Sequence, residues 1–242
     1  MLELKRISWD LPDGGEILRH IDLTVPDGKL IVVTGPNGGG KTTLAKIIAG
    51  LETPSGGSIW LDGQDITGLD VTQRARLGIA YAFQQPVRFK GITVRMLLEL
   101  AAGGSLKENE ACAFLAKVGL CAREYIDREV NASLSGGEIK RIEIATVLAR
   151  GARLSIFDEP EAGIDLWSFS SLIDAFGELR GKLSGSLLII SHQERILNIA
   201  DEIIVIADGG VRVSGPREDV LPKLLSGESF AGCPVMEGVG CK

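Results

Sequence analysis

The chain of 242 residues is long enough for one large α/β domain with an inserted helical lobe and a sizeable buried core. Its net charge of −6 disfavours a nucleic-acid-binding surface. No apolar run approaches the length needed to span a bilayer, and no secretory leader is recognisable, so we expect a cytoplasmic protein without direct membrane insertion.

The apolar run Leu30 to Val33 predicts a strand, and a glycine-rich loop separates it from a helix expected over Lys41 to Ala49. The loop fits the pattern G-x-x-x-x-G-K-[ST], in which backbone N–H groups surround a triphosphate, the lysine reaches its outer phosphates and the final hydroxyl binds Mg²⁺. We therefore expect ATP and Mg²⁺ at this loop. Its candidate binding residues are Gly35, Pro36, Asn37, Gly38, Gly39, Gly40, Lys41, Thr42 and Thr43.

Three glycines of the loop, Gly35, Gly38 and Gly40, are expected where a Cβ would prevent positive φ or a close approach to the phosphates. The partial positive charge at the start of the following helix would face the anion. Chance produces such a loop pattern in roughly one chain in a hundred of this length. The assignment therefore also depends on motifs further along the chain.

Helical periodicity follows Gln84, with candidate helices over Val94–Ala102 and Glu108–Val118. A loop around residues 101–105 separates them. We expect a single domain made of a core (residues 1–85 and 134–225), a helical lobe (about 86–133) and a glycine- and cysteine-containing tail (226–242).

The run Leu134 to Glu138 reads L-S-G-G-E, and Ser135 and Glu138 form a capping box at the start of an amphipathic helix. Gly136 and Gly137 leave that helix N-terminus bare enough for a second phosphate to approach. A well-capped helix without a ligand is the alternative, and the phosphate loop earlier in the chain argues against it.

A strand predicted over Arg153 to Phe157 ends in two acids, Asp158 and Glu159, where a parallel sheet presents ligand groups. Successive side chains of a strand point in opposite directions, so Asp158 is suited to Mg²⁺ and Glu159 to polarising an attacking water. A solvated strand end is the alternative. The next apolar run, Leu187 to Ile190, brings His192 to the same edge, where it could contact a γ-phosphate or have only a structural role.

Together these motifs resemble the ABC-type ATPases from Leu2 to about Gly215. The resemblance makes Gly35 to Thr42 the Walker A loop and Leu134 to Glu138 the signature, while Asp158 becomes the Walker B aspartate. It makes Glu159 the catalytic base and Gln84 the Q-loop glutamine, which contacts the metal and follows the lobe.

The same resemblance extends to three further positions. Asp165 ends a stretch from Ala162 that resembles the D-loop, and His192 matches the switch histidine. Trp9 lies where many relatives stack an aromatic ring on adenine, although simple packing is the alternative. The catalytic set implied is Lys41, Gln84, Glu159 and His192, and the metal ligands implied are Thr42, Gln84 and Asp158.

The family resemblance implies a RecA-like P-loop core with an N-terminal antiparallel β subdomain and an inserted α-helical subdomain. It also implies an ATP-dependent head-to-tail homodimer, in which the Walker A loop of one subunit and the signature of the other enclose each ATP. A second helix N-terminus, supplied across the interface, would give ATP a higher affinity for the closed state.

The signature departs from the transporter pattern L-S-G-G-Q-x-Q-R-V at Glu138, Lys140 and Glu143. These residues resemble the S-G-G-E-K-K-R-x-E-I run of SufC, the ATPase of iron–sulfur cluster assembly, as do Ala82 to Pro86 and Ser191 to Leu197. Pro160 and Ile164 do not follow that family, and the segment after Gly215 has no counterpart in it.

The SufC resemblance implies hydrolysis that drives a conformational change in a SufB/SufD-like scaffold. The first alternative is the ATP-binding subunit of a membrane transporter. A nucleic-acid-associated ABC protein is a second, and the single cassette without a long coiled-coil insertion argues against it.

No pair among the chain's cysteines has C-x-x-C spacing, so thiols in a reducing compartment are expected. Core packing is the expectation for Cys112 and Cys121. Cys233 and Cys241 lie in the glycine-rich tail, where contact with iron, sulfide or another metal is one hypothesis and an unstructured tail the other.

Overall fold

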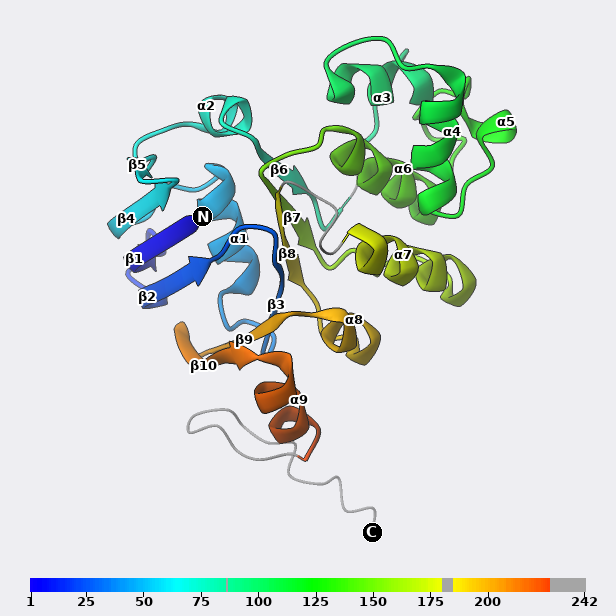
Figure 1. The fold of residues 1–242 in the computed structure, drawn as a ribbon. Coiled ribbons are helices and arrows are strands. Elements are labelled where there is room, and N and C mark those ends of the chain that lie inside the picture. Colours follow the sequence, from blue (N-terminus) through cyan, green and yellow to red (C-terminus); the bar gives the residue numbers. More distant parts are fainter. Residues whose placement is uncertain (86, 180–184, 227–242) are drawn as a thin grey trace.

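The structure is a computed structural model that describes residues 1–85, 87–179 and 185–226, and it contains two β-sheets separated by helix α1 (Figure 1). The strands are β1 (Leu2–Asp10), β2 (Glu16–Val25), β3 (Leu30–Thr34), β4 (Gly56–Leu61), β5 (Gln64–Asp65), β6 (Ile79–Ala82), β7 (Leu154–Asp158), β8 (Ser186–Ile190), β9 (Glu202–Ala207) and β10 (Gly210–Pro216). The helices are α1 (Lys41–Ala49), α2 (Val71–Arg76), α3 (Val94–Ala102), α4 (Glu108–Lys117), α5 (Ala122–Tyr125), α6 (Gly136–Ala149), α7 (Leu166–Leu179), α8 (Glu194–Ile199) and α9 (Arg217–Leu225).

The larger sheet has the order β10-β9-β3-β8-β7-β6, and all of its neighbouring strands are parallel except the pair β9 and β10. The smaller sheet is antiparallel, with the order β2-β1-β4-β5. Because parallel strands end at the same edge, the loops after β3, β6, β7 and β8 lie close together. This arrangement confirms the α/β fold expected from the sequence.

Alternating residues of the central strands enter two separate cores. Leu30 and Val32 of β3 belong to the core that also contains buried residues of α3, α4, α6, α7 and α8, whereas Ile31 and Val33 belong to the core that contains α1 and the smaller sheet. This follows from the opposite directions of successive side chains in a strand. The central sheet is therefore buried on both faces, as its nearly continuous apolar strands predict.

The segment between β6 and α6 folds into the predicted helices, with α3 and α4 packed against α6 (Figure 1). Helix α3 begins after Thr93, whose hydroxyl accepts from the Met96 N–H, and ends at Gly103 in a left-handed conformation. Thr93 also pairs with Glu129, which joins the two ends of the segment. The boundaries expected between the core (residues 1–85 and 134–225), the lobe (about 86–133) and the tail (226–242) remain a prediction.

Helix α1 is anchored at its C-terminal end by Arg74, which is 1 % exposed. The Arg74 guanidinium donates to the carbonyls of Ile47 and Ile48 in α1 and to those of Thr67 and Leu69 in the loop before α2. The buried cation thus adds donors to carbonyls at the end of α1, where the Ile47 carbonyl also accepts from the Gly50 N–H.

The expectation that Cys121 packs in the core is wrong, since Cys121 is exposed at the N-cap of α5, while Cys112 is half-buried. The hypothesis about Cys233 and Cys241 lies outside the described residues. Within residues 1–85, 87–179 and 185–226, no helix is both long and apolar enough to span a bilayer.

Candidate active site

An open cavity of about 520 Å³ lies where β3 passes into α1. Trp9 and Ile17 of the smaller sheet line one side, and Gln84 and Glu159 line another. The remaining lining residues are Leu11, Asn37, Gly38, Gly40, Lys41, Thr42 and Thr43. The structure thus brings Trp9 to the glycine-rich loop, although these residues lie far apart in sequence.

The backbone of the glycine-rich loop requires glycine, most clearly at Gly35. Gly35 has φ +132°, and an added Cβ would lie 2.0 Å from the Ile206 carbonyl oxygen of β9. No side chain can occupy that space. The expected positive φ angles also occur at Gly38 and Gly40, and α1 begins directly after Gly40 without a side-chain cap, so its N–H groups remain available.

Lys41 folds back along the loop, with only 6 % of its surface exposed. Its Nζ donates to the carbonyl oxygens of Gly35 and Pro36, both at 2.8 Å. Burial lowers the pKa of Lys41, and the nearby carboxylates of Glu159 and Asp158 oppose this effect. The ammonium is therefore held inside the loop, next to the acids of β7.

Asp158 at the end of β7 is fully buried, and both of its carboxylate oxygens accept hydrogen bonds. The Thr42 hydroxyl donates to Oδ1 at 3.1 Å and the Tyr81 hydroxyl to Oδ2 at 2.9 Å. Burial raises the pKa of Asp158, while these two bonds oppose the rise. The pKa of Tyr81 is raised as well. Burial is the largest cause, and the negative charge of Asp158 adds to the rise.

Glu159 lies in the left-handed region with φ 46°, which is unusual for a residue other than glycine. Its Oε2 accepts a 2.7 Å hydrogen bond from Nε2 of Gln84, and its Oε1 is 3.9 Å from Nε2 of His192. The turn after β7 thus places the Glu159 carboxylate between the glutamine after β6 and the histidine after β8.

His192 follows Ser191, whose hydroxyl donates to Glu161 at 2.6 Å. Burial, and then the positive charge of Lys41, lowers the pKa of His192, while Glu159 opposes this effect. At pH 7 the imidazole is therefore mostly neutral, with one nitrogen able to donate and the other to accept a proton.

The signature run begins α6 as expected from its capping box. The Ser135 hydroxyl accepts from the Glu138 N–H, and the Glu138 carboxylate accepts from the Ser135 N–H. The Tyr125 hydroxyl also donates to Glu138 and contributes most to lowering the pKa of Glu138 to about 2. None of the residues Ser135, Gly136, Gly137 and Glu138 lines the cavity at the glycine-rich loop.

Asp165 is an exposed residue immediately before α7. Its carboxylate accepts from the backbone N–H groups of Trp167 and Ser168 and from the Ser168 hydroxyl. These bonds cap the helix. Asp165, like the signature residues, is absent from the cavity lining, and its contact with nucleotide stays a prediction.

Lys140 and Glu143 are two further functional candidates. The sequence marks them only as positions in a family pattern and does not indicate what they contact. Both bind the backbone of Phe83, the residue before Gln84. Lys140 donates to the Phe83 carbonyl oxygen, and Glu143 Oε1 accepts from the Phe83 N–H at 2.8 Å. Their spacing on one face of a helix is the signal in the sequence, but their target lies in a distant loop.

Comparison with known proteins identifies the family. A family model described as ABC transporter matches residues 18–162. An uncharacterised ABC transporter ATP-binding protein of Methanocaldococcus jannaschii is 39 % identical over 213 residues, which cover 85 % of each chain. A probable branched-chain amino acid transport ATP-binding protein, LivG, of Archaeoglobus fulgidus is 34 % identical and covers 88 % of this chain and 89 % of its own.

Solved structures share the fold. An ATP-binding cassette solved as a dimer in a post-hydrolysis state with ADP and Pi superposes with a TM-score of 0.80 at 23 % identity, covering 90 % of this chain and 99 % of its own. The ATP-binding subunit of an ABC transporter gives a TM-score of 0.78 at 25 % identity and covers 95 % of each chain. With its glycine-rich loop, its capped helix α6 and its paired acids at the end of β7, the chain belongs to the ABC transporter family and is an ABC-type ATPase.

Proposed function

We propose that this chain is the cytoplasmic ATP-hydrolysing subunit of a membrane transport system and that it works as a head-to-tail pair. One observation carries the proposal: the Walker A loop and Glu159 share a cavity that the signature residues do not line. A second copy would supply those residues. The transporter names of the relatives and the dimeric cassette among the solved structures support this reading.

The residues around Asp158 fit Mg²⁺. Thr42, Asp158 and Gln84 offer hard oxygen ligands, and the Thr42 and Asp158 oxygens already lie 3.1 Å apart. When bound, Mg²⁺ neutralises phosphate charge and orients the β- and γ-phosphates. Lys41 and the free N–H groups at the start of α1 bind the same phosphates.

Glu159 orients the attacking water and accepts its proton, because it lines the cavity, whereas both oxygens of Asp158 accept hydrogen bonds from Thr42 and Tyr81. The hydrogen bond from Gln84 orients its carboxylate, and His192 lies on the other side, 3.9 Å from Oε1. The neutral imidazole of His192 is able to donate a hydrogen bond to the γ-phosphate. On the other side of the cavity, Trp9 stacks on the adenine.

The partner docks in a groove next to the active site, which we call the docking groove. It has a volume of about 270 Å³, and Phe83, the neighbour of Gln84, lines it. The other lining residues are Ala49, Leu51, Val71, Ala75, Ile79, Ala80, Tyr81, Val87, Phe89, Leu97, Ala101, Val130, Ile139, Ile142, Glu143, Thr146, Val147 and Arg150. These largely apolar walls suit a segment of another protein.

A SufC-type role with a SufB/SufD-like scaffold is the second candidate. The observation in its favour is that Glu138, Lys140 and Glu143, the positions that depart from the transporter pattern, all make specific contacts in the structure. The ATPase chemistry is the same in both roles, and only the partner differs.

The test is purification of the tagged chain from membrane and soluble fractions of its own cells without oxygen. Co-purification with a membrane protein supports the transport role, and co-purification with a soluble protein together with iron and sulfide supports the scaffold role. In parallel, ATP turnover is measured for the unmodified chain and ATP-dependent dimer formation for the Glu159→Gln variant. If the unmodified chain does not hydrolyse ATP and the variant does not dimerise, the shared proposal is refuted.

A further inference from the structure

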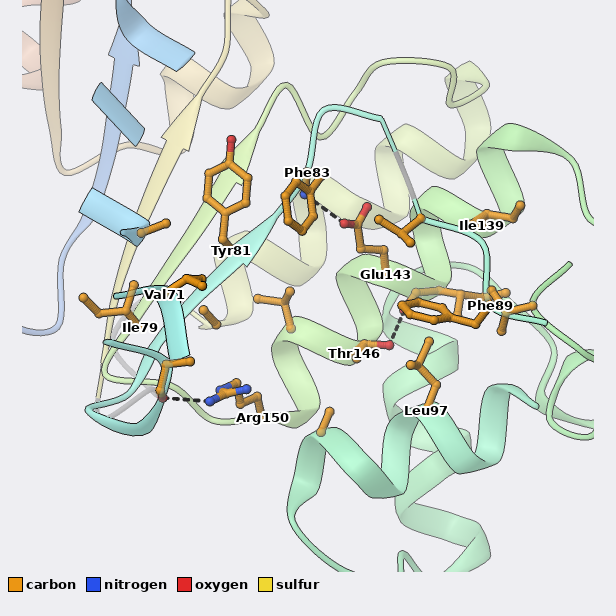
Figure 2. A pocket seen from close by; sticks show the side chains of 18 of the residues that line it. Val71, Ile79, Tyr81, Phe83, Phe89, Leu97, Ile139, Glu143, Thr146 and Arg150 are labelled. Atoms are coloured by element: carbon orange, nitrogen blue, oxygen red, sulfur yellow. Dashed lines mark hydrogen bonds between the residues drawn. The ribbon is translucent and has the colours of Figure 1, made fainter. Parts of the chain in front are cut away.

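Two buried acids each have one carboxylate oxygen without a partner. Among the residues that the structure describes, Oε2 of Glu143 and Oε2 of Glu161 are shut off from solvent and accept no hydrogen bond. Glu143 faces the docking groove (Figure 2), whereas Glu161 lies in the turn after β7, two residues beyond Glu159. Proteins satisfy nearly all of their buried polar groups, so such an exception requires an explanation. Glu161 does not line the cavity at the glycine-rich loop, and direct contact with nucleotide therefore does not explain it.

The other oxygen of Glu161 binds the turn after β8. The fully buried hydroxyl of Ser191 donates to Oε1 of Glu161 at 2.6 Å and accepts from the Gln193 N–H at 3.0 Å. Burial raises the pKa of Glu161, and donation from the Ser191 hydroxyl and from the backbone N–H of His192 opposes the rise. Glu161 thus holds the short segment of backbone that carries the His192 imidazole.

A second bond joins the same two turns. The Glu159 N–H donates to the Ile190 carbonyl oxygen at 3.0 Å, which ties the end of β7 to the end of β8. Glu159 has its left-handed conformation at this point, and its Oε1 lies 3.9 Å from Nε2 of His192. One backbone bond alone would act as a hinge between the turns. Together with the bond between Glu161 and Ser191, it restricts their relative orientation and hence the separation of the two side chains.

We propose that Glu161 is a positioning residue for ATP hydrolysis, which acts through Ser191 to hold the imidazole of His192 beside the carboxylate of Glu159. The inference rests on the proposed roles of Glu159 as the base and of His192 as a donor to the γ-phosphate. A misplacement of about 1 Å at a reacting group reduces rates by up to about a hundredfold. Because the unpaired Oε2 costs stability, positioning explains Glu161 better than a contribution to the stability of the fold does.

The first test measures steady-state ATP hydrolysis by variants of the full chain. Glu161→Ala removes the acceptor of the Ser191 hydroxyl and should lower kcat at least about tenfold, while KM for ATP changes less than about twofold because the glycine-rich loop is intact. Glu161→Gln keeps an oxygen acceptor and should retain kcat within about threefold. Asp65→Ala is the control, since it removes a carboxylate that accepts the Thr67 hydroxyl at the same 2.6 Å distance outside the cavity, and it should leave kcat unchanged.

The second test asks whether Glu161 acts through His192. In single-turnover hydrolysis, Glu161→Ala should cost less than about twofold when His192→Ala is already present, because the imidazole that it positions is then gone. The same loss with and without His192 would mean that Glu161 acts on another group, and it would overturn the inference.

The third test follows the position of His192 without any turnover. His20 and His192 are the two histidines of the chain, so both imidazole signals can be followed by NMR at one pH. Glu161→Ala should shift the signal of His192 and leave that of His20 in place. Glu161→Gln removes the same charge but keeps the acceptor, so neither signal should move.

Unchanged kcat in Glu161→Ala, an equal loss in Glu161→Gln, or an unshifted His192 signal overturns the inference. Urea unfolding checks that each variant is folded under the assay conditions. If Glu161→Ala does not fold, Ser191→Ala removes the same bond from its other side and carries the same expectations. An unmodified chain that does not hydrolyse ATP refutes the proposed function instead, and the NMR comparison then still decides whether Glu161 holds His192.

Discussion

Glu143→Gln should change how the stability of the protein depends on pH. Burial raises the pKa of the Glu143 carboxyl from its usual 4.5 to about 7, and the hydrogen bond from the Phe83 N–H offsets only part of this rise. The folded state therefore holds a proton on Glu143 at pH values where the unfolded chain has released it. By linkage, the free energy of unfolding falls as the pH rises from about 4.5 to about 7.

The size of the effect follows from the two pKa values. The interval between 4.5 and about 7, at roughly 1.36 kcal/mol per pH unit, corresponds to at most about 3 kcal/mol lost by the unmodified protein. Glutamine does not titrate, so the variant lacks this loss. Burying the amide adds a cost of roughly 1–3 kcal/mol, but that cost is the same at every pH and leaves the slope unchanged.

The assay is urea unfolding of the two proteins at a series of pH values between 4.5 and 8. Relative to the unmodified protein, the variant should gain about 2 to 3 kcal/mol across this range, because its own curve lacks the fall due to Glu143. Asp158 and Glu161, whose pKa values are also raised by burial, contribute equally to both curves and cancel in the difference. Parallel curves for the two proteins would refute the reasoning.

Other substitutions test single contacts of the site. Glu159→Gln should reduce turnover at least about a hundredfold while ATP remains bound, which gel filtration detects as a persistent dimer; unchanged turnover would place the base elsewhere. Lys140→Met removes the side-chain donor to the buried Phe83 carbonyl and should lower the free energy of unfolding by about 3 kcal/mol in urea titrations; an unchanged free energy of unfolding would contradict this role. Tyr81→Phe frees one oxygen of Asp158 and should change the Mg²⁺ concentration for half-maximal hydrolysis about tenfold, with ATP binding in EDTA as the control. Trp9→Ala should weaken ATP binding about tenfold by calorimetry, and an equal loss for a triphosphate without a base would contradict stacking.

The motifs of the site could be read from the sequence because each is local. The glycine-rich loop, the capping box at Ser135 and the paired acids after β7 depend on neighbours within a few residues, and a strand or helix signal precedes or follows each of them. The order of these elements also predicts that the loops after parallel strands meet at one edge. Trp9 reached the same cavity, although its stacking on adenine stays a prediction.

What the sequence did not reveal depends on contacts between distant segments. Tyr81 binds Asp158 across neighbouring strands, and Glu143 reaches Phe83 from another helix; no spacing rule within one element indicates either pairing. The left-handed conformation of Glu159 was also unexpected, because a glutamate normally avoids it. The prediction that Cys121 packs in the core was wrong because it rested on residue type alone, which favours burial. Cys121 lies at the N-cap of the short helix α5, which begins at the surface.

Arg74 bears on any attempt to transplant the phosphate-binding motif into another protein. Its guanidinium joins the end of α1 to the loop before α2, with bonds of 3.0 Å to Ile48 and 2.9 Å to Thr67. A graft that stops at Ala49 would remove Arg74 from the Ile47 and Ile48 carbonyls and leave the helix free to tilt. A graft must therefore extend at least to Arg74, well beyond the consensus, and a lysine in place of Arg74 could not replace it because one ammonium lacks the planar fork that reaches both segments.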